Sequence, residues 1–127
     1  MARVDRQRAE RKGRRGEWLA ALALLIKGYR ILARRVRTPR GEVDLIARRG
    51  NLLAFVEVKA RPNVEDALEA VSARAWNRIS AAAELWARQR FGEVEFSWRY
   101  DVVAICPGRW PIHLRDVWRP DFAKRRG

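Results

Sequence analysis

The chain contains little cysteine and little histidine. Its 127 residues include a single cysteine, Cys106, and a single histidine, His113. One cysteine excludes an internal disulfide, and one cysteine with one histidine excludes a zinc site built from several thiolates or imidazoles. Neither residue has a second ligand nearby in the sequence, so we interpret both as structural. A lone cysteine is typical of a reducing compartment, and we therefore expect a cytoplasmic protein.

Long hydrophobic runs are also missing. The longest is WLAALALLI over Trp18–Ile26, which falls short of the roughly 18 apolar residues of a membrane span. No signal-peptide cleavage pattern follows it. The basic segment before it lacks the broad aromatic and aliphatic face of helices that lie on membranes. We therefore expect no membrane partner.

Acidic residues are scarce relative to basic ones. Lys and Arg number 28 against 15 Asp and Glu, which gives a net charge of +13. Such an excess favours a polyanionic partner, and arginine, which supplies most of it, forks onto phosphate better than lysine does. A hydrophobic content of 48% excludes a disordered chain. The composition therefore predicts a folded nucleic-acid-binding protein, and the plainer alternative is a solvated surface.

The chain length suits one domain. We place this domain over residues 16–118, after a basic arm over residues 1–15 and before a basic tail over residues 119–127. Its first predicted helix, Glu17–Lys27, is followed by Gly28, a common residue at helix C-termini.

A second helix is predicted from Ala73 to about Arg90, with Ser72 as its N-cap. Its apolar residues recur at helical spacing, and we assign them to the core. They are Trp76, Ile79, Ala83 and Trp86.

Alternating or continuous apolar runs predict the strands. The order of elements is helix, three strands, helix, and one or two strands. This order predicts an α+β or α/β domain whose mixed central sheet is flanked by helices. Val64–Val71 is predicted to be a loop with a helical turn. The predicted strands are Tyr29–Val36, Glu42–Arg48, Leu52–Lys59, Glu93–Cys106 and Ile112–Trp118.

The dipeptide Gly50-Asn51 is suited to a two-residue hairpin turn. In that register Asp44 faces Glu57, and directly opposed side chains lie on one face of the sheet, about 5 Å apart. Lys59 shares the face of Glu57 because side chains alternate along a strand. The turn alone therefore predicts that two acids and one amine meet in one patch.

This patch suits a divalent cation. Two close carboxylates repel each other, and Mg²⁺ binds through one or two carboxylates together with water and phosphate. Lys59 would then stand beside the same phosphate, where it could orient water or stabilise developing charge. The alternative is a plain cross-strand ion pair between Lys59 and one of the acids.

These residues resemble a known pattern. An aspartate near a turn, a strand carrying Glu-x-Lys and an upstream helical glutamate resemble the PD-(D/E)xK nuclease superfamily. Four blocks in order resemble the YraN-like family of small bacterial proteins over nearly the whole chain. The blocks are RRGE (Arg14–Glu17), GEVDLIA (Gly41–Ala47), FVEVKAR (Phe55–Arg61) and RYDVVAI (Arg99–Ile105).

The resemblance implies a restriction-endonuclease-like core and Mg²⁺- or Mn²⁺-dependent hydrolysis of phosphodiester bonds. It makes Asp44 and Glu57 metal ligands and Lys59 the catalytic lysine. Glu17 matches an additional helical carboxylate of the similar archaeal Holliday-junction resolvases and would bind metal through water. The alternative for Glu17 is an exposed residue in the first turn of a helix, favoured by the helix dipole.

Nucleic-acid contacts are expected from three arginines. Relatives often carry a lysine where this chain has Ala75, and Arg74 and Arg78 flank that position. Arg61 follows Lys59 by two residues and shares its face if the strand continues. A solvated surface role is the alternative for each.

The resemblance therefore implies an endonuclease acting on DNA, and on branched or otherwise structured DNA in particular, because no base-reading helix motif is present. Resolution of a four-way junction requires two active sites, so the analogy also implies a homodimer. The alternative function is a DNA- or RNA-binding protein that retains the fold without turnover.

Overall fold

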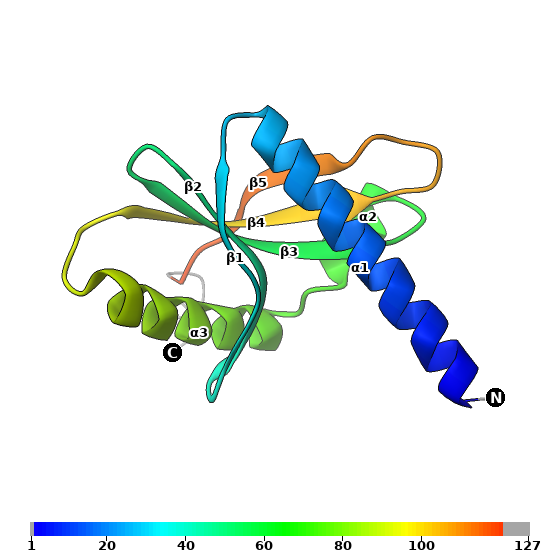
Figure 1. The fold of residues 1–127 in the computed structure, drawn as a ribbon, viewed down its shortest axis with the longest axis horizontal. Coiled ribbons are helices and arrows are strands. Elements are labelled where there is room, and N and C mark those ends of the chain that lie inside the picture. The colour runs from blue at the N-terminus through cyan, green and yellow to red at the C-terminus, as the bar shows by residue number, and fades with distance from the viewer. Residues whose placement is uncertain (1, 121–127) are drawn as a thin grey trace.

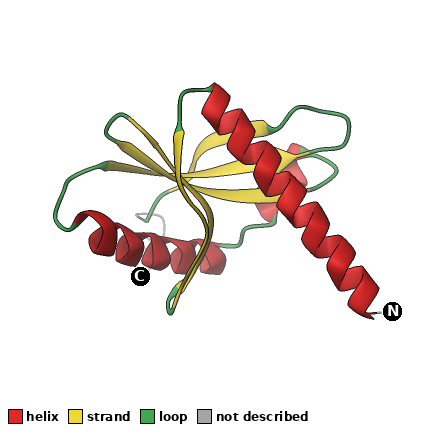
Figure 2. Ribbon diagram, viewed as in Figure 1, coloured by secondary structure: helices red, strands yellow, loops and turns green. Residues whose placement is uncertain are grey.

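A computed structural model describes residues 2–120 of the chain, and the side chains of residues 14–120. Most of the expected basic tail, residues 121–127, lies outside the described part. The described residues form three helices and a five-stranded sheet, whose arrangement is drawn in Figures 1 and 2. The elements are α1 (Ala2–Ile26), β1 (Arg30–Thr38), β2 (Gly41–Arg49), β3 (Leu52–Ala60), α2 (Val64–Glu69), α3 (Ala73–Phe91), β4 (Ser97–Ile105) and β5 (Ile112–Trp118).

The sheet has the order β1-β2-β3-β4-β5. All neighbours are antiparallel except β3 and β4, which are parallel and are joined through α2 and α3. This arrangement confirms the predicted mixed α+β domain and is compatible with a restriction-endonuclease-like core. Among the described residues, no helix is long and apolar enough to cross a bilayer.

Helices cover both faces of the sheet (Figure 2). α1 packs through Ala20 and Leu24 on one face, where Val56 and Val103 join the same cluster. The larger cluster lies on the other face, under α3. Three of the four predicted core positions of α3 are buried and Trp86 is half-buried; the buried ones are Trp76, Ile79 and Ala83.

Local capping chemistry fixes several boundaries. The Ser72 hydroxyl accepts a hydrogen bond from the N–H of Ala75 at 3.1 Å and begins α3, as predicted. Gly28 has a φ of 92° just after α1, in the left-handed region that glycine adopts easily.

Three boundaries differ from the sequence predictions. α1 begins at Ala2, so the segment expected as an arm continues the helix. α2 takes up most of the segment predicted as a loop with a helical turn, and Asn63 caps it by accepting a hydrogen bond from Asp66 N–H at 2.8 Å. β4 begins at Ser97, later than expected, because the chain first turns at Gly92 after α3.

Gly41 lies where the backbone of α3 approaches the start of β2. A Cβ atom at this position would lie 2.7 Å from the carbonyl oxygen of Arg78. We expect Gly41→Ala to lower the free energy of unfolding by about 1–3 kcal/mol, as overpacking does. Urea denaturation measures the effect.

Gly16→Ala is the matched control. Gly16 lies within α1, and a Cβ atom there would lie 3.6 Å from the side chain of Ile105, an ordinary contact distance. It should be neutral or stabilising by up to about 1 kcal/mol. Equal stability of both variants would show that α3 does not pack closely on β2.

Candidate metal and nucleic-acid site

The sheet opens between β2 and β3. The hairpin register runs from Arg49 opposite Leu52 to Leu45 opposite Val56, as the Gly50-Asn51 turn predicts, and pairing stops there. β2 continues alongside β1 to Gly41, and β3 continues alongside β4 to Ala60. Asp44 and Glu57 are therefore the first residues beyond the last pair, at the point where the two halves of the sheet separate.

The two carboxylates bridge this opening. The N–H of Asp44 donates to Oε2 of Glu57 at 3.1 Å, and the N–H of Val58 donates to Oδ2 of Asp44 at 2.8 Å. Each acid thus accepts a hydrogen bond from a backbone N–H of the opposite strand that has no partner in the β2–β3 pairing. Within the described residues, Oδ1 of Asp44 and Oε1 of Glu57 accept no hydrogen bond. Each carboxylate therefore keeps one oxygen for another ligand.

The backbone is irregular at the same point. In the ladder between β1 and β2, Arg35 would face Asp44, but that pair is missing. Arg35 has a φ of 52°, a conformation that costs a non-glycine residue about 1–3 kcal/mol. Val43 and Ile46 belong to the same core cluster, although regular alternation would place them on opposite faces. β2 therefore twists through Asp44.

Burial sets the electrostatics of the acid pair. Glu57 is only 8% exposed, and this burial, with repulsion from Asp44 second, raises its pKa to about 8. Burial also raises the pKa of Asp44, and repulsion from Glu17 and Glu42 raises it further. The hydrogen bond from Val58 N–H and the charge of Lys59 lower this pKa, but by less. Two carboxylates that resist ionisation together are a suitable environment for a divalent cation, which removes their repulsion.

Lys59 lies close to the acids but is not bonded to them. Its positive charge lowers the pKa values of Asp44 and Glu57. Among the described residues, however, it makes no ion pair within 4.0 Å and no hydrogen bond. The plain cross-strand ion pair is thus not formed, and the ammonium group stays available to a ligand.

Glu17 lies near this pair without joining it. Its Oε2 accepts a hydrogen bond from Nε of Arg35 at 2.6 Å. Glu17 belongs to α1, which packs on one face of the sheet. Because side chains alternate along β3, Glu57 shares the other face with Phe55. Within residues 14–120, no three His, Cys, Asp or Glu side chains gather as a ready metal site. The described ligand set for a metal is therefore Asp44 and Glu57.

The three arginines predicted to contact nucleic acid are all exposed. Arg61 is exposed, but β3 ends at Ala60, so the strand alternation that would align Arg61 with Lys59 stops short of it. Arg74 and Arg78 are exposed one turn apart on α3. The backbone of Arg78 meets Gly41, three residues before Asp44.

Comparison with known proteins gives a consistent answer. The model of the uncharacterised protein family UPF0102 matches residues 16–105. The chain belongs to the UPF0102 family. A UPF0102 protein of Chelativorans sp. is 60% identical over 92% of this chain and 94% of its own length. Those of Mesorhizobium japonicum and Maricaulis maris are 54% and 47% identical, over 91% and 98% of this chain and 92% and 98% of their own lengths. These matches confirm the resemblance to YraN-like proteins.

Sequence reasoning did not identify a cavity of about 500 Å³ in this UPF0102 chain, between α1 and β1. The signal in the sequence was the set of arginines interleaved with apolar residues in the strand predicted over Tyr29–Val36. Arg14, Glu17, Trp18, Arg34 and Arg35 line the cavity.

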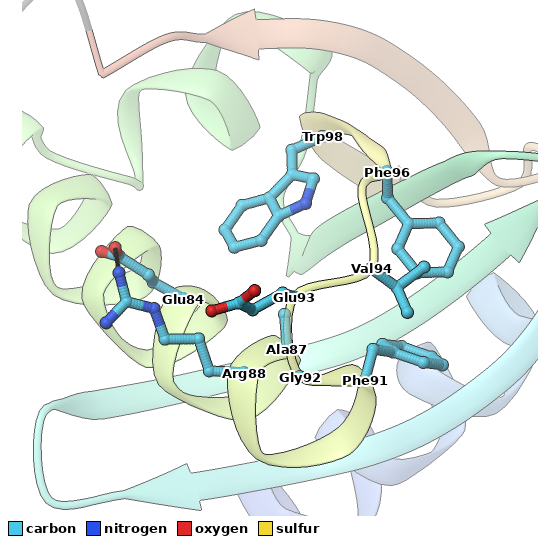
Figure 3. A pocket seen from close by; sticks show the side chains of 9 residues that line it. All are labelled: Glu84, Ala87, Arg88, Phe91, Gly92, Glu93, Val94, Phe96 and Trp98. Atoms are coloured by element: carbon cyan, nitrogen blue, oxygen red, sulfur yellow. Dashed lines mark hydrogen bonds and ion pairs between the residues drawn. The ribbon is translucent and has the colours of Figure 1, made fainter.

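A larger cavity of about 650 Å³ lies at the other end of the UPF0102 domain (Figure 3). It is formed by the end of α3 and the segment leading into β4, and Glu84 and Arg88 pair at its rim. Trp98 at its edge is the partner of Leu53 in the parallel register. This cavity is therefore near the start of β3, whereas Glu57 lies four residues further along.

The acid pair predicts a pH dependence of stability for the metal-free UPF0102 chain. The pKa of Glu57 rises on folding from 4.5 to about 8, so folding favours the protonated acid. Its contribution to stability is fully present below pH 4.5 and is lost as the pH rises through about 8. We expect Glu57→Gln to unfold at a higher temperature than the wild type at pH 8, and the gap to close toward pH 4.5.

Calorimetry in a metal-chelating buffer measures this difference. The exposed Glu93→Gln serves as the control and should follow the wild-type curve. A gap between Glu57→Gln and the wild type that is independent of pH would contradict burial of this carboxylate.

Proposed function

We propose that the protein is a Mg²⁺- or Mn²⁺-dependent endonuclease that hydrolyses phosphodiester bonds in DNA, with branched or otherwise structured DNA as its substrate. The observation that carries the proposal is the pair Asp44 and Glu57, each with one free oxygen, beside an unpaired Lys59 at the opening of the sheet. The net charge of +13 supports a polyanionic substrate.

The residues fit a hard divalent cation, since both free groups are carboxylate oxygens. When bound, such a cation supplies Lewis-acid activation of the phosphate and of a water molecule. Asp44 and Glu57 would hold it from adjacent strands, and their bonds to backbone N–H groups fix their orientation. Lys59 would place its charge beside the scissile phosphate and stabilise the negative charge that develops there.

The proposal is tested with end-labelled duplex, flap and four-way-junction DNA incubated with the purified protein. We expect cleavage in Mg²⁺ or Mn²⁺, loss of cleavage in EDTA, and a faster rate on the branched substrates than on the duplex. Cleavage that persists in EDTA, or no cleavage of any substrate in either metal, would contradict it.

A second candidate is a nucleic-acid-binding protein without turnover. Both acids already serve backbone donors, and the described residues provide no third metal ligand in contact with them. In this case binding of DNA or RNA should be strong and steeply salt-dependent, because it would depend on phosphate contacts. DNA and RNA competitors in the same binding assay distinguish the two polymers, and the cleavage assay separates this candidate from the nuclease.

Action on a four-way junction also requires a second active site, so we propose a homodimer. Light scattering on the free protein and on its junction complex measures the mass. Two protein chains per junction are expected, and one chain per junction would restrict the substrate to flaps and ends.

A cytoplasmic location, proposed from the lone cysteine, is checked by cell fractionation.

A further inference from the structure

Trp18 is a large apolar side chain left in solvent. It is 59% exposed on α1. Four of the six tryptophans contact another ring, but within the described residues no ring contacts Trp18. An indole that is more than half exposed leaves apolar surface in water and offers a stacking surface to a flat aromatic ligand.

Two arginines line the same cavity as this indole. Trp18 lines the 500 Å³ cavity together with Arg14 and Arg34. The volume of this cavity lies within the roughly 300–1,000 Å³ typical of small-molecule sites. Among the described residues, neither arginine has an ion-pair partner. A cavity lined by an aromatic surface and by two arginines suits a ligand that carries both a flat ring and a phosphate.

The cavity lies beside the part of β2 that carries Asp44. Arg34 and Arg35 line it from β1. Arg34 and Val36 pair with Leu45 and Val43, the two neighbours of Asp44 in β2. A nucleic-acid backbone that passes the acid pair would therefore place neighbouring nucleotides at this cavity. A base held inside a duplex is already stacked on both faces and cannot stack on Trp18, whereas an unpaired base can.

We propose that the cavity between α1 and β1 binds one unpaired nucleotide next to the scissile phosphate, with the base stacked on Trp18 and the phosphate held by Arg14 and Arg34. The proposal rests on the nuclease function and narrows its substrate to DNA with an unpaired nucleotide beside a duplex, as at a fork, flap or gap. Selection comes from the geometry of the strand and not from the identity of the base.

The test measures binding in EDTA, so that it needs no chemistry. Fluorescence anisotropy compares a labelled duplex with the same duplex carrying a single-stranded arm, for the wild type and Trp18→Ala. We expect Trp18→Ala to weaken binding of the armed substrate by about 5- to 150-fold, the factor that corresponds to about 1–3 kcal/mol of base stacking. Binding of the plain duplex should be unchanged.

Three variants sharpen the result. Trp110→Ala removes an equally bare tryptophan, 56% exposed, which does not line this cavity, and should bind both substrates like the wild type. Trp18→Phe should restore most of the affinity for the armed substrate, since phenylalanine keeps a stacking face. Arg34→Ala should weaken binding and reduce the salt slope by about 1 if it holds one phosphate.

Each outcome bears on a different claim. An equal loss on both substrates, or no loss on either, would overturn the nucleotide site. A change of oligomeric mass in Trp18→Ala would also overturn it and assign Trp18 to a subunit contact. If the wild type prefers the armed substrate through Trp18 but never cleaves it in Mg²⁺ or Mn²⁺, the nucleotide site stands and the nuclease proposal fails.

Discussion

Asp44→Asn is expected to cleave DNA at least about 1,000-fold more slowly than the wild type in Mg²⁺, while its affinity for DNA stays within about twofold. Asparagine retains an oxygen that can accept the hydrogen bond from Val58 N–H, so the opening of the sheet should survive. It loses the negative charge that a divalent cation requires. Lys59→Met should give a loss of similar order, because it removes the charge beside the phosphate and keeps the length of the side chain.

Single-turnover rates with excess protein measure this effect without interference from product release. Glu42→Gln is the matched control, since Glu42 is an exposed carboxylate of the same strand that pairs with Arg37. It should cleave at close to the wild-type rate. Equal cleavage by Asp44→Asn and the wild type would trace the activity to a contaminant or to another site.

Asp101→Ala is expected to lower the free energy of unfolding by about 3–5 kcal/mol, the loss that follows removal of one partner from a buried ion pair. Asp101 is fully buried in β4. Its carboxylate accepts hydrogen bonds from Arg99 at 2.8 Å and from the N–H of Asp116 at 2.9 Å, and lies 2.7 Å from Nε2 of His113. Alanine removes the acceptor from His113 and from the N–H of Asp116, and leaves Arg99 with the Tyr29 hydroxyl alone.

The same network should fail in acid. Burial alone would raise the pKa of Asp101, but hydrogen bonds from His113, Arg99 and the N–H of Asp116 overcome it and lower the pKa below 3.8. The stabilisation is therefore present above pH 3.8 and is lost as the pH falls through the lower pKa of the folded state.

Urea denaturation at pH 7 measures the cost of Asp101→Ala. Glu84→Ala is the control, because it breaks an exposed i,i+4 pair with Arg88 that is worth only about 0.3–0.5 kcal/mol. A similarly small loss for Asp101→Ala would show that water reaches the network and replaces the carboxylate.

Features that depend on nearby residues could be predicted from the sequence. The Gly50-Asn51 turn determines the register of β2 and β3, and Ser72 determines the start of α3. Asp44 and Glu57 come together for the same local reason, since they lie only thirteen positions apart in the sequence, with one tight turn between them. Only a helical turn within a loop was predicted over Val64–Val71, because the six residues of α2 are too few to show a period.

Features that depend on distant residues could not be predicted. Regular pairing of Asp44 with Glu57 was expected, but the sheet opens there as β1 and β2 twist away together. That twist involves Arg35 and Val43 and leaves no pattern in the sequence of β2 alone. The role of His113 depends likewise on the pairing of β4 and β5, which brings it to Asp101 across twelve residues.

A crystal of the wild-type protein soaked in Mn²⁺ at neutral pH is the most direct measurement of the central claim. An anomalous peak should lie between the free oxygens of Asp44 and Glu57, Oδ1 and Oε1, with Lys59 beside it, and should disappear in Asp44→Asn crystals soaked in the same way. Ordered carboxylates without a peak between them, or a peak only elsewhere on the surface, would contradict the metal-dependent nuclease and leave a protein that only binds nucleic acid.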